Sequence, residues 1–198
     1  MRWLGSLFVA ALLVVPFSAQ AAPIRLVGTF SGANENPAVA TLGTGFVVVD
    51  VDAVAHTLFL NATFSGLTGT TTAAHIHCCQ IPPTNAGVAT TTPSFVGFPL
   101  GVTSGTFTNT LDLTSPSSYN PAFVTANGGT VASAEAALVA GLLGGRAYFN
   151  IHTSFVGSGE IRANLAETPE PATIVLVGVG LAAAVVARRR TNRQHAEA

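Results

Sequence analysis

The sequence predicts a mainly β protein, built as an antiparallel sandwich or Greek-key barrel with one short helix. Seven segments alternate apolar and polar residues, as strands with one buried face do. Clusters of Gly, Pro, Asn and Ser separate these segments, and such clusters favour turns. Several short strands divided by turns are typical of sandwiches and barrels. The predicted strands are 24–30, 45–51, 56–64, 73–77, 103–113, 146–152 and 160–165.

The alternation is clearest in the third and sixth of these strands. In 56–64, every second residue from Leu58 to Phe64 is apolar. In 146–152, apolar residues beginning at Ala147 alternate with polar ones, and the last predicted strand repeats this pattern. Because successive side chains of a strand point to opposite faces, each strand is expected to have one apolar and one polar face.

One segment favours a helix instead. Residues 133–143 are rich in Ala and Leu, which are good helix formers. Thr130 or Ser133 can cap the start of this helix, and the two glycines after residue 143 can end it. A helix of three turns would place Leu138 and Leu142 against the sheet.

The first 21 residues are typical of a secretory signal peptide. A short positive start, Met1-Arg2-Trp3, precedes an almost wholly apolar run over residues 4–17. Ser18-Ala19-Gln20-Ala21 then supplies small residues in the A-x-A arrangement of a cleavage site. We expect signal peptidase to cut after Ala21 and the rest of the chain to be exported.

The other end of the chain predicts a membrane segment. Residues 172–187 contain no charged side chain, and Arg188-Arg189-Arg190 follows directly. A helix of this length spans about 24 Å, somewhat less than the roughly 30 Å hydrocarbon core of a bilayer, and local thinning can make up the difference. A transmembrane helix is therefore predicted over 172–187, with the arginines on the cytoplasmic side.

Pro169-Glu170-Pro171 stands just before this segment. Pro-Glu-Pro, a short apolar helix and an Arg cluster, in this order, resemble the PEP-CTERM sorting signal of Gram-negative bacteria. The resemblance implies that an exosortase in the inner membrane recognises and removes the tail, residues 169–198. It further implies delivery to the cell surface or extracellular matrix and a link with exopolysaccharide.

The domain between the two signals, residues 22–168, is sparsely charged and mildly acidic. The whole chain has only 9% charged residues, against roughly 25% in ordinary soluble domains. The domain itself carries three arginines and seven acidic residues. A nucleic-acid binder needs a basic face, so this function is excluded. Long stretches at 78–101 and 112–130 are expected to be loops, which often carry function.

Two histidines of the fourth predicted strand share one face. His75 and His77 are separated by Ile76, so both rings lie within reach of one metal ion. His152 ends the sixth strand on its polar face, and Glu160 begins the last strand on what is read as the same side. Imidazoles with a carboxylate suit Zn or Cu. The alternative is a polar strand face that binds nothing.

Cys78 and Cys79 follow directly and are the only two cysteines. Export favours disulfides over free thiols, but adjacent cysteines form only a strained ring. Three alternatives remain open: a vicinal disulfide, two thiolate ligands that join His75 and His77 on a soft metal, and pairing between chains.

Catalytic motifs are absent from the sequence. It contains no G-x-S-x-G elbow, no H-E-x-x-H pair and no phosphate-cradling glycine loop. We therefore predict no catalytic residues and a protein that is not an enzyme of these classes.

Four short motifs, in order, resemble the successive signatures of the CHRD domain, first recognised in chordin and also found in bacterial proteins. They are 31–37 (SGANENP), 74–77 (AHIH), 148–153 (YFNIHT) and 159–162 (GEIR). The resemblance extends over residues 24–165 and implies an immunoglobulin-like or Greek-key β fold and a non-catalytic extracellular module. This chain departs from the family after residue 35, where it has one proline, and after residue 77, where two cysteines stand in place of glycine.

These observations lead to one main hypothesis and two others. The main one is an exported surface or matrix module that binds a partner or serves a structural role. The second is a Cu or Zn redox protein that uses His75, His77 and His152, because the His-x-His strand is similar to the copper/zinc superoxide dismutase pattern. The third is a polysaccharide binder that uses Tyr148 as a stacking aromatic.

Overall fold

The computed structural model describes residues 22–168 and the pair 179–180. The signal peptide with its cleavage site at Ala21, the Pro169-Glu170-Pro171 motif and the Arg188–Arg190 cluster all lie outside the described residues. So does the predicted span 172–187, apart from the described pair. In the described segments we find no helix with the length and apolar character needed to cross a membrane.

The domain is one antiparallel sheet that curls on itself, which confirms the predicted fold class. The strands lie in the order β5-β4-β7-β8-β1-β2-β3-β6, and β9 pairs with β1. All seven predicted strands are present, with two short strands, β5 and β9, in addition. The strands are β1 (Ile24–Ser31), β2 (Thr44–Asp52), β3 (Thr57–Ser65), β4 (Thr71–Cys78), β5 (Gly87–Val88), β6 (Gly105–Asp112), β7 (Ala147–Thr153), β8 (Ile161–Asn164) and β9 (Ala166–Glu167).

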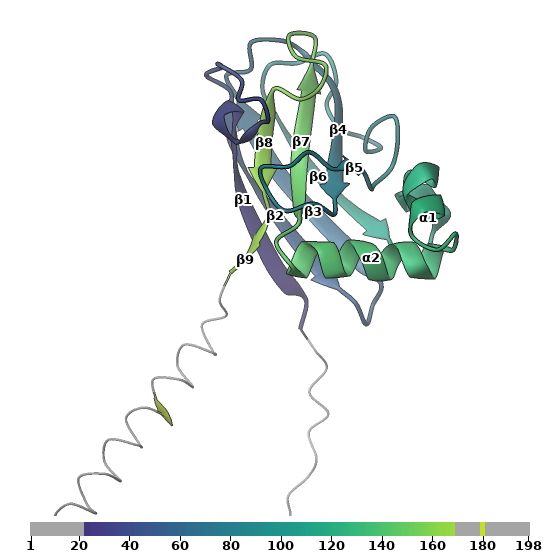
Figure 1. The fold of residues 1–198 in the computed structure, drawn as a ribbon. Helices are drawn as coiled ribbons and strands as arrows, with labels where there is room; N and C mark the ends of the chain where they lie inside the picture. Colours follow the sequence, from purple (N-terminus) through teal and green to yellow (C-terminus); the bar gives the residue numbers. More distant parts are fainter. Residues whose placement is uncertain (1–21, 169–178, 181–198) are drawn as a thin grey trace, which may run out of the picture.

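The curl of the sheet places β4, β7 and β8 in front of β2, β3 and β6 (Figure 1). The apolar core fills the space between these two halves. Phe30 of β1 meets Phe149 of β7 edge to face at 5.4 Å, and Phe95 lies between Phe149 and Phe107 of β6. The apolar face of β3, from Leu58 to Phe64, is buried as its alternation predicts.

The predicted helix is confirmed as α2 (Val131–Leu143). Thr130 is its N-cap, and Ser133 completes a capping box, so both residues act at the helix start. Leu138 and Leu142 are fully buried. The helix lies across one end of the curled sheet, near the start of β1 and near β9 (Figure 1).

The two stretches predicted to be loops both contain regular structure, which their composition did not indicate. The stretch 112–130 includes η2 (Pro116–Ser118) and α1 (Pro121–Ala126), which Asn120 caps and Pro121 begins. Proline at the first helical position is favourable because its missing N–H has no partner there. The stretch 78–101 includes β5. A further short helix, η1 (Gly32–Asn34), follows β1.

Strand β7 is buried at all seven of its residues. The alternation in its sequence predicts an apolar face and a polar face, and both exist. The polar face is not on the surface, however, because the surrounding loops bond to it. Tyr148 bonds to Ala86, Asn150 to the carboxylate of Glu35 and His152 to the carbonyl of Gly157. This covered polar face holds the candidate site.

Gly141 provides a test of how α2 docks. A side-chain carbon at this position would overlap the sulfur of Cys78 and press on that of Cys79. In a helix interior, Gly→Ala alone stabilises by about 0.8–1.0 kcal/mol, whereas overpacking costs about 1–3 kcal/mol. We expect Gly141→Ala to lower the free energy of unfolding by about 1 kcal/mol in denaturant titrations. Gly87→Ala, where a methyl group meets nothing within 4 Å, is the control. An equally or more stable Gly141→Ala variant would contradict this packing.

Candidate metal centre

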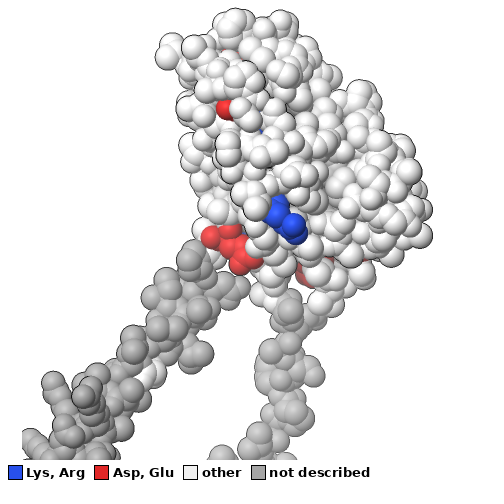
Figure 2. All heavy atoms as spheres, viewed as in Figure 1, with Lys and Arg blue, Asp and Glu red and all other residues white. Residues whose placement is uncertain are grey.

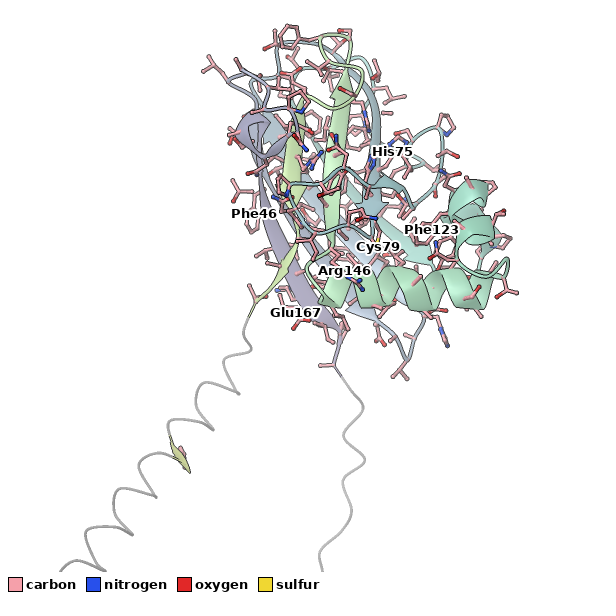
Figure 3. The ribbon with its side chains drawn as sticks, in the orientation of Figure 1. Phe46, His75, Cys79, Phe123, Arg146 and Glu167 are labelled. Carbon is pink, nitrogen blue, oxygen red and sulfur yellow. A yellow bond between two sulfur atoms is a disulfide. The ribbon has the colours of Figure 1, made fainter. Side chains whose placement is uncertain are left out.

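Three histidines from two neighbouring strands meet on the covered polar face. His75 and His77 share a face of β4, and His152 projects from β7, which pairs with β4. His152 Nε2 lies 3.2 Å from His75 Nδ1 and 3.5 Å from His77 Nε2. One ring nitrogen from each residue lies within 4.8 Å of the other two. Figure 3 shows His75 on the strand β4 that carries the pair.

The second nitrogen of each ring faces a backbone carbonyl. His75 Nε2 is 2.7 Å from the oxygen of Pro93, and His77 Nδ1 is 2.9 Å from that of Ala86. His152 Nδ1 is 3.1 Å from the oxygen of Gly157. A carbonyl oxygen only accepts hydrogen bonds, so each of these three nitrogens must carry the hydrogen. In a neutral ring, the nitrogen that faces the cluster therefore has a lone pair.

Burial keeps the three rings neutral. It lowers the pKa of His75, His77 and His152 below the ordinary histidine value of 6.5, and the pKa of His77 falls to about 4. At neutral pH, three lone pairs thus face one another with no hydrogen between them. Such an arrangement is repulsive in itself, and a cation at its centre would remove the repulsion.

The separations fit a tetrahedral transition metal. Zn–N bonds of about 2.0–2.1 Å place two ligands of a tetrahedron about 3.3–3.4 Å apart. The two separations from His152 are 3.2 and 3.5 Å, and the His75 and His77 nitrogens lie within 4.8 Å of each other. Metal-binding histidines also donate their other N–H to a carbonyl or carboxylate, which fixes the ring and its tautomer. All three rings meet this condition, and neutral imidazole suits Zn and Cu. Three histidines leave the fourth position of a tetrahedron open.

Glu160 does not join the three histidines. Its two oxygens accept hydrogen bonds from the hydroxyls of Thr41 and Thr153 and from the amides of Thr68 and Gly69. Burial alone would raise the pKa of this carboxyl, but these hydrogen bonds together hold it below its usual value. The carboxylate thus ties the loop after β3 to the end of β7. The expectation that it shares the histidine side is wrong, because the chain turns between Gly159 and β8.

The structure selects one of the three alternatives for the cysteine pair. Cys78 and Cys79 form a vicinal disulfide, so no thiolate is available to join His75 and His77. Cys78 ends β4 and is buried, and both sulfurs pack on Gly141 of α2. In Figure 3, Cys79 lies between the sheet and α2.

A buried ion pair lies beside the histidines and was not predicted. Arg162 of β8, 2% exposed, lies 3.2 Å from Oε2 of Glu35. Its guanidinium also donates to the side chain of Asn85. The motif at 31–37 positions this carboxylate, because Asn34 donates to the backbone oxygen of Arg162. That motif was the only sign in the sequence that Glu35 has a special place.

Tyr148 connects the ion pair with the histidines. The guanidinium of Arg162 lies 3.8 Å from the centre of its ring, and the ring of His77 stacks on it at 4.9 Å. The hydroxyl of Tyr148 bonds to the backbone of Ala86, the residue that also holds His77. Tyr148 is only 1% exposed. The prediction that this ring offers a surface for stacking sugars is therefore wrong.

The surface around the site carries little charge. Figure 2 shows that the face seen in Figure 1 is almost entirely uncharged.

Comparison with known proteins gives two family matches. The model of the CHRD domain matches residues 26–165, which include most of β1, all of β2 to β8 and all three histidines. The model of the PEP-CTERM protein-sorting motif matches residues 167–190. No curated protein and no solved structure matches the chain.

Glu160→Gln separates a structural role from a metal-binding role for this side chain. Hydrogen bonds to a charged group contribute about 1.5–3 kcal/mol, so we expect a loss of about that size in the free energy of unfolding at pH 7. Because folding lowers the pKa of Glu160, its contribution is present above pH 4.5 and is lost as the pH falls further. The stability difference between wild type and variant should therefore shrink in acid. Glu167→Gln, at an exposed position of β9, is the control. Loss of bound metal without loss of stability would contradict the structural role.

Proposed function

Because the chain belongs to the CHRD domain family and carries a PEP-CTERM sorting motif, we propose that it is an exported, exosortase-processed module whose β domain binds one Zn or Cu ion. We place the mature protein at the cell surface or in the extracellular matrix of a Gram-negative bacterium. There the domain would serve as a binding or structural component.

One observation supports the metal site above all others. His75, His77 and His152 each place one lone-pair nitrogen within 4.8 Å of the other two, and each outer N–H is donated to a backbone carbonyl. A polar strand face that binds nothing has no reason to orient three rings in this way. Histidines that only complete a hydrogen-bond network would donate to one another, and here the inward nitrogens have no hydrogen to donate.

The sorting motif supports the proposed route of export and processing. Signal peptidase would cleave after Ala21, and the apolar stretch 172–187 would then hold the chain in the inner membrane. Exosortase would recognise Pro169-Glu170-Pro171 and remove the tail, with Arg188–Arg190 on the cytoplasmic side. We propose exopolysaccharide or other matrix components as partners of the released domain.

A redox enzyme is the second candidate function. A three-histidine set leaves a coordination position open, as catalytic metal sites do and closed structural sites do not. With copper bound, the same residues would support one-electron chemistry of the superoxide dismutase type. An assay of the copper-loaded protein for superoxide or peroxide consumption decides between a redox catalyst and a site that only binds the metal.

The proposed metal site predicts how many ions the protein binds and which substitution abolishes the binding. Exported protein exposed to Zn²⁺ or Cu²⁺ should retain about one ion per chain by elemental analysis, and His75→Ala should abolish retention. Removal of the ion with a chelator should lower Tm, because an ion at 100 times its Kd adds about 2.7 kcal/mol of stability. His56→Ala is the matched control, since His56 pairs with Glu135 on the surface. A wild-type protein that stays metal-free after exposure to both ions would refute the proposal.

The sorting route predicts the fate of a truncated chain. Deletion of residues 169–198 should stop tail processing, because the exosortase substrate is gone, and the protein should leave the surface fraction. Cell fractionation with immunodetection measures both effects. Glu197→Ala, which lies beyond the matched motif, should be sorted normally. Unchanged surface delivery of the truncated chain would count against exosortase processing.

A further inference from the structure

A small pocket lies next to the three histidines. Its volume is about 190 Å³, and its lining includes His77, Tyr148 and Arg162 from the sheet. The loops 35–39 and 156–159 and residues 85–86 complete its wall. Of the three histidines, only His77 lines it. A molecule in this pocket would therefore approach the proposed metal ion from the side of His77.

Two buried oxygens near this pocket have no hydrogen-bond donor among the described residues. They are Oε1 of Glu35 and Oδ1 of Asn150. Glu35 lines the pocket and is only 7% exposed. Asn150 lies behind it and donates to the other carboxylate oxygen at 3.4 Å. A buried acceptor without a partner destabilises the fold, and Glu35 lines the pocket whereas Asn150 does not. Oε1 of Glu35 is therefore the oxygen for which a bound molecule would supply a donor.

The charges around the pocket restrict what that molecule can be. Arg162 and Glu35 neutralise each other, and a metal ion at the histidines would repel a cationic ligand. A neutral hydroxyl group can bind to the metal ion and to Glu35. Its oxygen has a lone pair for the ion, and its hydrogen can be donated to the carboxylate. A pocket of about 190 Å³ has room for a small polyol or a single sugar ring.

We infer that this pocket binds a small neutral polyol, with one hydroxyl directed to the metal ion and another donated to Oε1 of Glu35. The inference rests on the proposed metal site and adds the class of ligand that the site takes. It also gives Glu35 a role in binding rather than only in the ion pair with Arg162.

The test uses the exported protein loaded with Co²⁺, whose visible absorption, unlike that of Zn²⁺, responds to changes at the fourth ligand position. Glycerol and glucose are the two probes. Ala38 is exposed at the rim of the pocket, and Ala40, on the same loop, is exposed and does not line it. Ala38→Phe should fill the pocket without disturbing the buried network, and Ala40→Phe is its matched control.

We expect a saturable spectral change with at least one probe in wild type and in Ala40→Phe, with Kd values within about twofold. Ala38→Phe should bind Co²⁺ fully and show a Kd at least tenfold higher for that probe. If Co²⁺ binds fully but neither probe changes its spectrum, the polyol assignment is wrong and the metal site stands. Water would then be the donor to the two unpartnered oxygens. An unchanged Kd in Ala38→Phe would also overturn the polyol assignment, because the ligand would then bind elsewhere. A wild-type protein that does not bind Co²⁺ would overturn the metal site and, with it, this inference.

Discussion

The burial of a polar strand face is the constraint on which the rest of this domain depends. One face of β7 carries Phe149 into the apolar core, and the other carries Tyr148, Asn150 and His152 beneath loops. A polar group removed from water must find a partner, or it destabilises the fold. The covering loops therefore supply a carboxylate from Glu35 and several backbone carbonyls. The three histidines keep their orientation because this same covering layer holds each ring from outside.

Features that depend on residues close together in the chain, such as strands and helix caps, could be predicted from the sequence. Contacts between residues far apart in the chain could not. Alternation located the strands, capping residues located α2, and the His-x-His spacing placed two imidazoles on one face. None of these patterns reveals that the polar face is covered, since Glu35 and Arg162 meet across 127 positions of the chain. Backbone carbonyls such as that of Gly157 have no sequence signature at all. Glu160 was misplaced because a turn at Gly159, with φ of 131°, interrupts the alternation on which its assignment rested.

Most of the few charged residues of the domain form hydrogen bonds or ion pairs within the fold. Arg25 and Asp50 are direct neighbours on β1 and β2 and form two hydrogen bonds of 2.8 Å. Arg162 is paired inside, where loss of either partner would leave an uncompensated buried charge. Low charge in this chain therefore does not mean that electrostatics is unimportant. It leaves a weakly charged exterior around a polar interior, and the buried groups are those that the proposed ligand would contact.

The strand that carries His75 and His77 also lies near one edge of the sheet, and its outer side is closed. Strand β5 pairs with only two of its residues. Farther along, the amides of Ala89 and Phe95 bond to its carbonyls, and the hydroxyls of Ser94 and Thr90 accept from its amides. An open edge invites a strand of another molecule to add to the sheet, which is a common start of aggregation. Copies of this protein crowded together after export would find no template for cross-chain strand pairing along this stretch.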